Sequence, residues 1–159
     1  MEINIEWQKP ILLAQRKSLT QREQILAFVE DKPGVYYFSR KFGPKCYPFY
    51  IGESLRIRSR LIQHFDNARM FCILTGTPGP RLQEIAQGSR QFHFGYLAGK
   101  QNKAKQCIRI VQKLLIEEAI AQKHILINTA LTRIKQHEVN FNGNRRGRGV
   151  FSQLYAVEA

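Results

Sequence analysis

Alternating apolar and polar positions predict several short strands along the chain. Aromatic and β-branched residues dominate three such segments, which is typical of half-buried strands. The first two flank a Gly-Pro turn, so we expect them to pair as a β-hairpin with a tip at KFGPK. A further apolar run after Pro10 predicts a short edge strand or a loop. The three strands are GVYYFSR (34–40), CYPFYIG (46–52) and RQFHFGYLA (90–98), and the apolar run is ILLA (11–14).

Apolar residues recurring at helical spacing predict the helices. In the segment 18–30 we expect Ser18 or Thr20 to cap a helix whose apolar face holds Ile25, Leu26, Phe28 and Val29. Ser54 is expected to cap a second helix over about 54–66. Residues 103–124 give the longest helical pattern. Segment 70–89 predicts an apolar helix, a Pro/Gly loop and a short helix, and ILINTAL (125–131) predicts a strand or an extended segment beside the sheet. With no internal repeat or linker, this is one α/β domain over 1–159.

Charge is the unusual feature of the composition. The chain has 25 Lys and Arg against 12 Asp and Glu, a formal net charge of +13. Such an excess attracts polyanions, nucleic acid first and anionic membrane surfaces second. A basic surface that only aids solubility is the alternative. No apolar stretch is long enough for a membrane-spanning helix, and MEINIEWQKP lacks the apolar region of a secretory signal.

Three cysteines, Cys46, Cys72 and Cys107, are widely spaced and form no Cys-x-x-Cys pair. This argues against a disulfide framework or a thiolate zinc site, and it favours a reducing cytoplasm. We expect the three thiols to serve as small core residues.

The predicted helix after the hairpin carries a row of basic groups. Arg56, Arg60 and His64 follow one another at intervals of four, which places them on one helical face. Arginine binds phosphate oxygens through fixed donors, and a histidine beside it can move a proton near neutral pH. The row therefore predicts a phosphate site, with a solvated basic face as the alternative.

Two carboxylates interrupt the longest apolar helix. Glu117 and Glu118 lie among Leu, Ile and Ala residues, and carboxylates are rarely placed there unless they are paired or hold a cation. In a protein drawn to phosphates they suggest a Mg²⁺-type ion completed by phosphate oxygens. An exposed pair, or a salt bridge to Arg60 or Lys113, is the alternative. A helical wheel places Glu118 near the middle of the arc formed by Cys107, Ile110, Val111, Leu114 and Leu115, with Glu117 at its edge.

Several of these residues together resemble the GIY-YIG nucleases. Gly34-Val35-Tyr36 and Tyr50-Ile51-Gly52 look like the two triplets that name the family, and Arg60 and His64 stand where its helical arginine and histidine (or tyrosine) stand. The IEEAIA context (116–121) is similar to that of the family's metal-binding glutamate, in a register that selects Glu117. Asn128 matches its closing asparagine. The resemblance covers about residues 30–130 and leaves 131–159 as a basic extension.

The resemblance implies an antiparallel sheet of about three strands flanked by helices (α+β), and an endonuclease that hydrolyses phosphodiester bonds in DNA with Mg²⁺ or Mn²⁺. Glu117 would hold the metal and Arg60 would brace the scissile phosphate. Tyr36 would activate water or relay a proton, and Tyr50 and His64 would orient water or share in proton transfer. Gly34, Gly52 and Asn128 would support the site.

Further cations lie outside the motif and predict phosphate contacts beyond the catalytic pocket. They are Lys103 and Lys105, and Arg145, Arg146 and Arg148 near the C-terminus. Two other interpretations stay open. One is a nucleic-acid-binding module that kept the fold but lost turnover, and the other is a basic adaptor in which the motif is accidental. The sequence does not indicate an oligomeric state.

Overall fold

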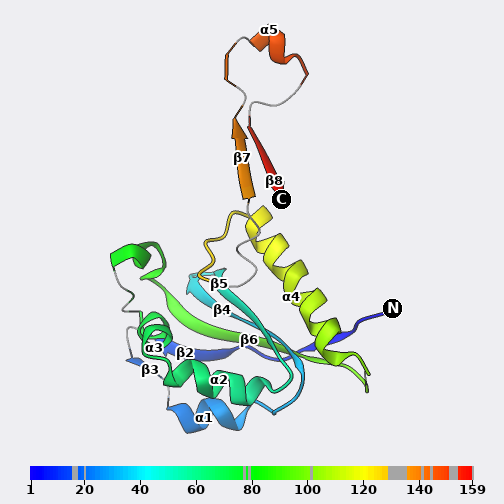
Figure 1. Ribbon diagram of the computed structural model, residues 1–159. Helices are drawn as coiled ribbons and strands as arrows, with labels where there is room; N and C mark the ends of the chain where they lie inside the picture. Colours follow the sequence, from blue (N-terminus) through cyan, green and yellow to red (C-terminus); the bar gives the residue numbers. More distant parts are fainter. Residues whose placement is uncertain are drawn as a thin grey trace. The chain divides into compact units, whose positions relative to one another are not determined.

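The computed structural model describes two compact units, Met1–Ile127 and Asn128–Ala159, each considered by itself below. The predicted single domain over 1–159 remains a prediction. Figure 1 shows the elements of both units. The residues described are 1–15, 18–19, 21–76, 78, 80–100, 102–128, 136–140, 142–143, 145–150 and 154–158.

The first unit is built on one antiparallel sheet with strand order β3-β2-β6-β4-β5, and β1 also pairs with β6. The three predicted strands correspond to β4, β5 and β6. The prediction of about three strands was too low, because the N-terminal segment adds β1 and β2 along the free edge of β6 and β3 beside β2. Pro10 has no N–H to donate, and it lies at the break between β1 and β2. The strands are β1 (Ile5–Trp7), β2 (Ile11–Gln15), β3 (Ser18–Leu19), β4 (Gly34–Phe42), β5 (Lys45–Ser54) and β6 (Ser89–Leu97).

Helices cover both faces of this sheet, so the expected α+β class is confirmed. Figure 1 shows α1, α2 and α3 on one side and α4 on the other. The helices are α1 (Arg22–Ala27), α2 (Ile57–Asp66), α3 (Ala68–Leu74), the 3-10 helix η1 (Pro80–Ile85) and α4 (Ala104–Ala121).

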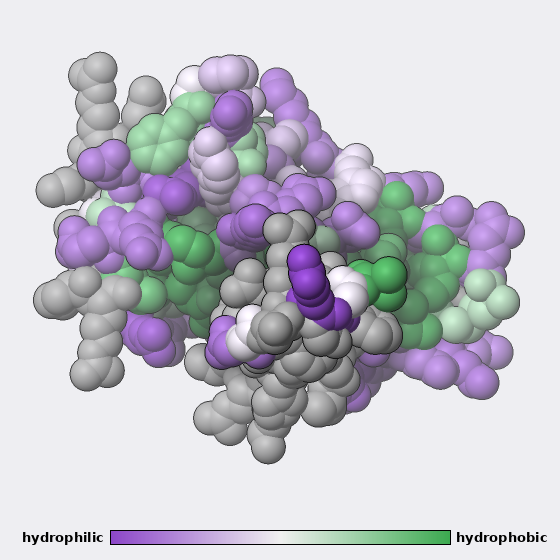
Figure 2. Space-filling model, turned by 90° about the horizontal axis from the view of Figure 1, so that it is seen from above, coloured by the Kyte–Doolittle hydropathy of each residue, from purple (hydrophilic) through white to green (hydrophobic). Residues whose placement is uncertain are grey.

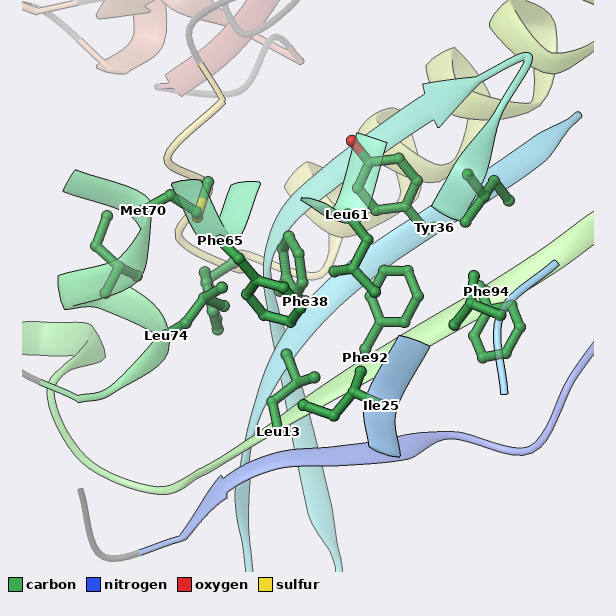
Figure 3. Close-up of a cluster of buried hydrophobic side chains, with 14 of the residues drawn as sticks. Leu13, Ile25, Tyr36, Phe38, Leu61, Phe65, Met70, Leu74, Phe92 and Phe94 are labelled. Carbon is green, nitrogen blue, oxygen red and sulfur yellow. The ribbon is translucent and has the colours of Figure 1, made fainter. Parts of the chain in front are cut away.

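Strand β4 divides its side chains between two hydrophobic clusters because successive strand residues point to opposite faces. Tyr36 and Phe38 join the larger cluster with Leu61 of α2 and Phe92 of β6 (Figure 3). Val35 joins the smaller cluster, which also holds Leu97, Cys107 and Ile108. The alternation of β4 therefore decides which residues face α1–α3 and which face α4.

The predicted helix caps were wrong where the structure describes them. Ser18 lies in β3, and α1 begins after Gln21, which makes no side-chain cap; Thr20 lies outside the described residues. Ser54 ends β5, and α2 begins after Arg56. A residue distant in sequence caps α2 instead: Asp31 accepts hydrogen bonds from the Ser59 backbone N–H at 3.0 Å and from its hydroxyl at 2.9 Å. Sequence spacing cannot reveal such a partner.

Two side chains expected in an apolar face are exposed. Phe28 is 72% exposed, although its neighbours Ile25 and Val29 are buried as predicted. Among the cysteines only Cys107 is buried, whereas Cys46 and Cys72 are exposed, so the predicted core role holds for Cys107 alone.

The segment after α4 forms neither a helix nor a strand over 124–128. Its Ile127 packs against the larger cluster, and the Ile127 N–H donates to the Phe49 carbonyl at 2.8 Å. The strand predicted for ILINTAL is therefore absent over 125–128, whereas Ile127 does lie beside the sheet; 129–131 lie outside the described residues.

The second unit contains an antiparallel pair, β7 (Gln136–Asn140) and β8 (Leu154–Glu158), with Asn140 opposite Leu154. A short helix, α5 (Arg145–Arg148), lies between them in the sequence. Within the ranges described for both units, no helix is both long and apolar enough to cross a membrane.

Candidate active site

The hairpin register brings the two motif tyrosines onto one face of the sheet. Tyr36 lies opposite Gly52, and Phe38 lies opposite Tyr50, so the rings of Tyr36 and Tyr50 project on the same side. Their centroids are 6.3 Å apart and their planes differ by 23°. Tyr36 is 1% exposed, whereas Tyr50 is partly buried. In Figure 3 the Tyr36 hydroxyl points away from Phe92, at the margin of the cluster.

The two motif glycines are required by close approaches. A Cβ on Gly52 would lie 2.3 Å from both Cζ and Oη of Tyr36, so the phenol lies directly over this glycine. A Cβ on Gly34 would lie 2.0 Å from the carbonyl oxygen of Gly95 on the neighbouring strand. Gly52 thus makes room for the Tyr36 ring, and Gly34 makes room for the sheet backbone.

His64 is the direct partner of Tyr36. Its Nε2 lies 2.7 Å from the Tyr36 hydroxyl oxygen, and its ring meets Phe38 and Tyr50 edge-on at 5.3 and 5.1 Å. Burial, with the charge of Arg60 as a second cause, lowers the pKa of His64 to about 4. The imidazole is therefore neutral at pH 7. In the tautomer with its proton on Nδ1, it accepts a hydrogen bond from Tyr36.

Arg60 is the cation of the cluster. Burial disfavours its charge, but its electrostatic and hydrogen-bonding interactions with Tyr36 and then Tyr50 outweigh burial and raise the pKa of Arg60. Burial, then Tyr50, raises the pKa of Tyr36 well above its usual range, and Arg60 acts against this rise. The Arg60 guanidinium also donates to Gln63 Oε1 at 2.8 Å. The phenols and the guanidinium thus form one half-enclosed polar group at the margin of the core.

Arg56 does not share the face of Arg60 and His64. Its backbone, with φ −141° and ψ 83°, is not helical. Its guanidinium pairs with Asp31 at 2.8 Å. The predicted three-residue face was therefore wrong at Arg56, because the helix begins one residue later. A nucleic-acid contact by this side chain, which is 71% exposed, remains a prediction.

The two glutamates of α4 differ in burial. Glu117 is half-buried, and its carboxylate lies 3.5 Å from Lys113 Nζ, one of the two ion pairs that the sequence left open. Glu118 is exposed. The helical-wheel arc was wrong as a guide to burial, because Ile110 and Leu114 are 45% and 54% exposed. The buried positions of α4 are Cys107, Ile108, Ile116 and Ala119.

Glu117 is compatible with a metal ion whose coordination shell is completed by waters and by phosphate oxygens of a substrate. Over the residues described, no cluster of three or more His, Cys, Asp or Glu could hold an ion. Magnesium commonly uses one or two protein carboxylates with waters and substrate phosphates, so one carboxylate fits its chemistry. Helix α4 is tied to β5 between the motif residues, since Gln112 Nε2 donates to the Ile51 carbonyl at 3.1 Å. Glu117 follows about 7.5 Å further along the helix axis.

The remaining predicted residues belong to other elements. Asn128 is 8% exposed and is the first residue of the second unit. Lys103 and Lys105 are exposed at the start of α4. Arg146 is exposed and Arg148 is partly buried on α5, whereas the side chain of Arg145 lies outside the described part. Figure 2 shows both hydrophilic and hydrophobic side chains among the coloured residues of the face that it displays.

Three residues of the site were missed in the sequence. Phe38 supports His64, and its position two residues after Tyr36 on one strand could have shown this. Gln63 and Gln112 make side-chain hydrogen bonds that no spacing indicates.

Comparisons of the chain with protein-family models, with curated proteins and with solved structures found no match.

Proposed function

We propose that this protein is a divalent-metal-dependent endonuclease of the GIY-YIG type that hydrolyses phosphodiester bonds in DNA. One observation carries the proposal: the Tyr36 hydroxyl lies 2.7 Å from a buried, neutral His64, while Arg60 acts on both the Tyr36 and Tyr50 phenols. A phosphate needs a fixed cation, and its attacking water needs a group that moves a proton. This cluster offers both.

Arg60 is suited to brace the scissile phosphate. Its guanidinium is half-buried, so its field is less screened than that of a surface arginine. It stays charged at any relevant pH and presents several donors to phosphate oxygens. As negative charge develops on these oxygens, the guanidinium stabilises the transition state.

Tyr36 and His64 are suited to act as a proton relay. Because its pKa lies above its usual range, the Tyr36 phenol stays protonated at neutral pH and does not form a phenolate that could act as a base by itself. The relay avoids this: water gives a proton to the Tyr36 oxygen as Tyr36 passes its own to His64 Nε2. The water oxygen forms its bond to phosphorus while the bond to the leaving oxygen breaks. The negative phosphate then stabilises the imidazolium.

Glu117 would hold the Mg²⁺ or Mn²⁺ ion. When bound, the ion neutralises charge on the phosphate and on the leaving oxygen. Asn128 remains a supporting residue by resemblance.

The proposal is tested by incubating the purified protein with end-labelled duplex, branched and single-stranded DNA, in Mg²⁺ or in EDTA. We expect cleavage of at least one substrate in Mg²⁺ and none in EDTA. Metal-independent binding without cleavage of any substrate would favour the inactive binding module instead. If the motif were accidental, binding would survive exchange of every residue of the cluster.

Arg60→Ala tests the role of the guanidinium. We expect cleavage to fall by about 10²–10³-fold, which corresponds to roughly 2.7–4 kcal/mol of transition-state stabilisation, with little change in DNA affinity. Arg58→Ala is the matched control, because Arg58 is an exposed arginine on the same helix. Equal losses of binding and cleavage in Arg60→Ala would make Arg60 a surface anchor.

A further inference from the structure

The face of β4 opposite the tyrosine cluster carries a second aromatic group. Tyr37 and His93, which are paired across β4 and β6, stack with ring centroids 4.2 Å apart and planes only 7° from parallel. Trp7 of β1 meets Tyr37 edge-on at 5.8 Å and 67°. We call Trp7, Tyr37 and His93 the aromatic platform.

The sequence and the sheet hold this platform in place. Trp7 lies opposite Gly95, and a Cβ at Gly95 would come within 3.1 Å of the Trp7 ring, so the absent side chain lets the indole lie on the sheet. The buried hydroxyl of Ser39 lies 2.9 Å from His93 Nε2 and fixes the imidazole. Burial lowers the pKa of His93 to about 4, so its ring is uncharged at pH 7.

The platform is open among the residues that the structure describes. Helix α4 packs at the Val35 and Leu97 end of this face. On the far side of β6 from Val35, Trp7 is 46% exposed, and Leu12, whose strand partner is Gln91, is 41% exposed. Tyr37 and His93 are partly exposed. Rings that served only as core would be enclosed like Tyr36 and Phe38.

The platform's face of β4 carries exposed Lys41 at one end and Glu53, opposite Val35, at the other, so the Lys41 end is the one that favours a polyanion. Tyr37, Ser39 and Lys41 occupy alternate positions of β4, so exposed Lys41 lies on the same face as the rings. Glu6 lies between Ile5 and Trp7 on β1, and the same alternation turns it to the other face. A partly exposed group of aromatic rings beside a cation, on a chain of net charge +13, has the chemistry that stacks unpaired bases while attracting their phosphates.

We infer that the aromatic platform binds single-stranded DNA by stacking its unpaired bases on Trp7 and Tyr37. The inference relies on the proposed function only in taking DNA as the polyanion. The platform uses none of the residues of the tyrosine cluster, so base stacking and cleavage can fail separately. A substrate with an unpaired segment, such as a branched or gapped duplex, would engage both faces of the sheet.

Intrinsic fluorescence tests the inference directly, because Trp7 is the one tryptophan of the chain. The full-length protein is titrated in EDTA with a short oligothymidylate and with an abasic oligonucleotide of equal length. We expect the oligothymidylate to quench Trp7 and to bind about tenfold more tightly than the abasic strand, since each stacked base contributes measurably to affinity. Equal affinities and unchanged fluorescence would overturn the inference.

Variants assign the effect to the platform. By anisotropy of labelled oligothymidylate, Trp7→Leu and Tyr37→Leu should each bind about tenfold more weakly. The control, Phe71→Leu, removes another exposed ring, 41% exposed on α3, and should bind like the wild type. If Tyr37→Leu does not fold, as judged by circular dichroism, the affinity of Trp7→Leu decides the test, because Trp7 is an exposed side chain. Wild-type affinity in Trp7→Leu would overturn the inference. A wild-type dimer that Trp7→Leu dissociates would also overturn it, because the platform would then be an interface between two copies of the chain.

Arg60→Ala separates the two proposals. It should keep the Trp7 quenching by oligothymidylate while losing cleavage. Quenching without cleavage by the wild type on any substrate would contradict the nuclease and leave the stacking surface standing.

Discussion

Tyr36 and Tyr37 are neighbours in the sequence but belong to opposite environments. Tyr36 is 1% exposed, hydrogen-bonded to His64 and acted on by Arg60. Tyr37 is partly exposed and stacks on His93 beside an exposed Trp7. Burial is the first cause of a raised pKa for both phenols, but only Tyr36 has a cation acting against it.

The difference shows how one strand can serve two purposes. On one face, Tyr36 and His64 are enclosed and hydrogen-bonded to each other, which suits the proposed chemistry on a single phosphate. On the other face, flat rings stay partly open, which suits binding through surface area. The same residue type therefore acquires a different environment by a shift of one position along β4.

We expect the largest effect from a substitution in α4. This helix packs on the Tyr37 face of the sheet, so the substitution tests whether α4 contributes to the proposed chemistry of the Tyr36 face. Glu117→Gln should lower Mg²⁺-dependent cleavage by about 10³-fold, because loss of a metal ligand removes several kcal/mol of charge stabilisation. Glu118→Gln, its exposed neighbour, should change cleavage only a few-fold. Rates are measured on one labelled DNA substrate under single-turnover conditions. Loss of cleavage in Glu118→Gln alone would move the metal assignment to Glu118.

The next effect compares the histidines of the two faces, buried His64 and partly exposed His93, through the pH dependence of stability. The pKa of His64 is about 4 in the folded chain against 6.5 for an ordinary histidine, so between these values the unfolded chain binds the additional proton. Stability is therefore lost as pH falls from 6.5 to 4, by on the order of 3 kcal/mol for His64. The pKa of His93 is also lowered to about 4, but this side chain is partly solvated, so it should contribute less to the loss of stability.

Urea unfolding at several pH values measures this loss for the wild type, His64→Gln and His93→Gln. The His64 variant should show the flatter profile of the two. A steeper acid loss in His64→Gln than in the wild type would contradict the assigned neutral state.

The smallest expected effect concerns the glycines beneath the two aromatic groups. Gly52→Ala places a Cβ 2.3 Å from a Tyr36 ring that is enclosed in the core, so we expect a loss of about 2 kcal/mol of unfolding free energy. Gly95→Ala meets Ile5 and Trp7 on an edge strand that can shift, and should cost less. Thermal and urea unfolding measure both. A Tyr36→Leu background should relieve much of the Gly52→Ala loss, and simple additivity of the two changes would argue against the clash.

The sequence alone determined the strands and helices that carry the candidate site. Period-two alternation identified β4, β5 and β6, and helical spacing identified α4, because local patterning reflects which side must be buried. The paired triplets also pointed to Tyr36, Tyr50, Arg60 and His64, and the structure brings these four together. Their role in cleavage stays a prediction.

Only the tertiary structure decided which partners complete those elements. Asp31 caps α2 from a distant segment, and the N-terminal strands extend the sheet along β6. Arg90, strongly polar in the sequence, is 1% exposed and donates to the carbonyls of Ile73 and Gln87. The exposure of Phe28 and Glu118 likewise depends on which elements pack against them. A sequence pattern records the period of burial, whereas hydrogen-bond partners and covered faces depend on contacts between segments far apart in the chain.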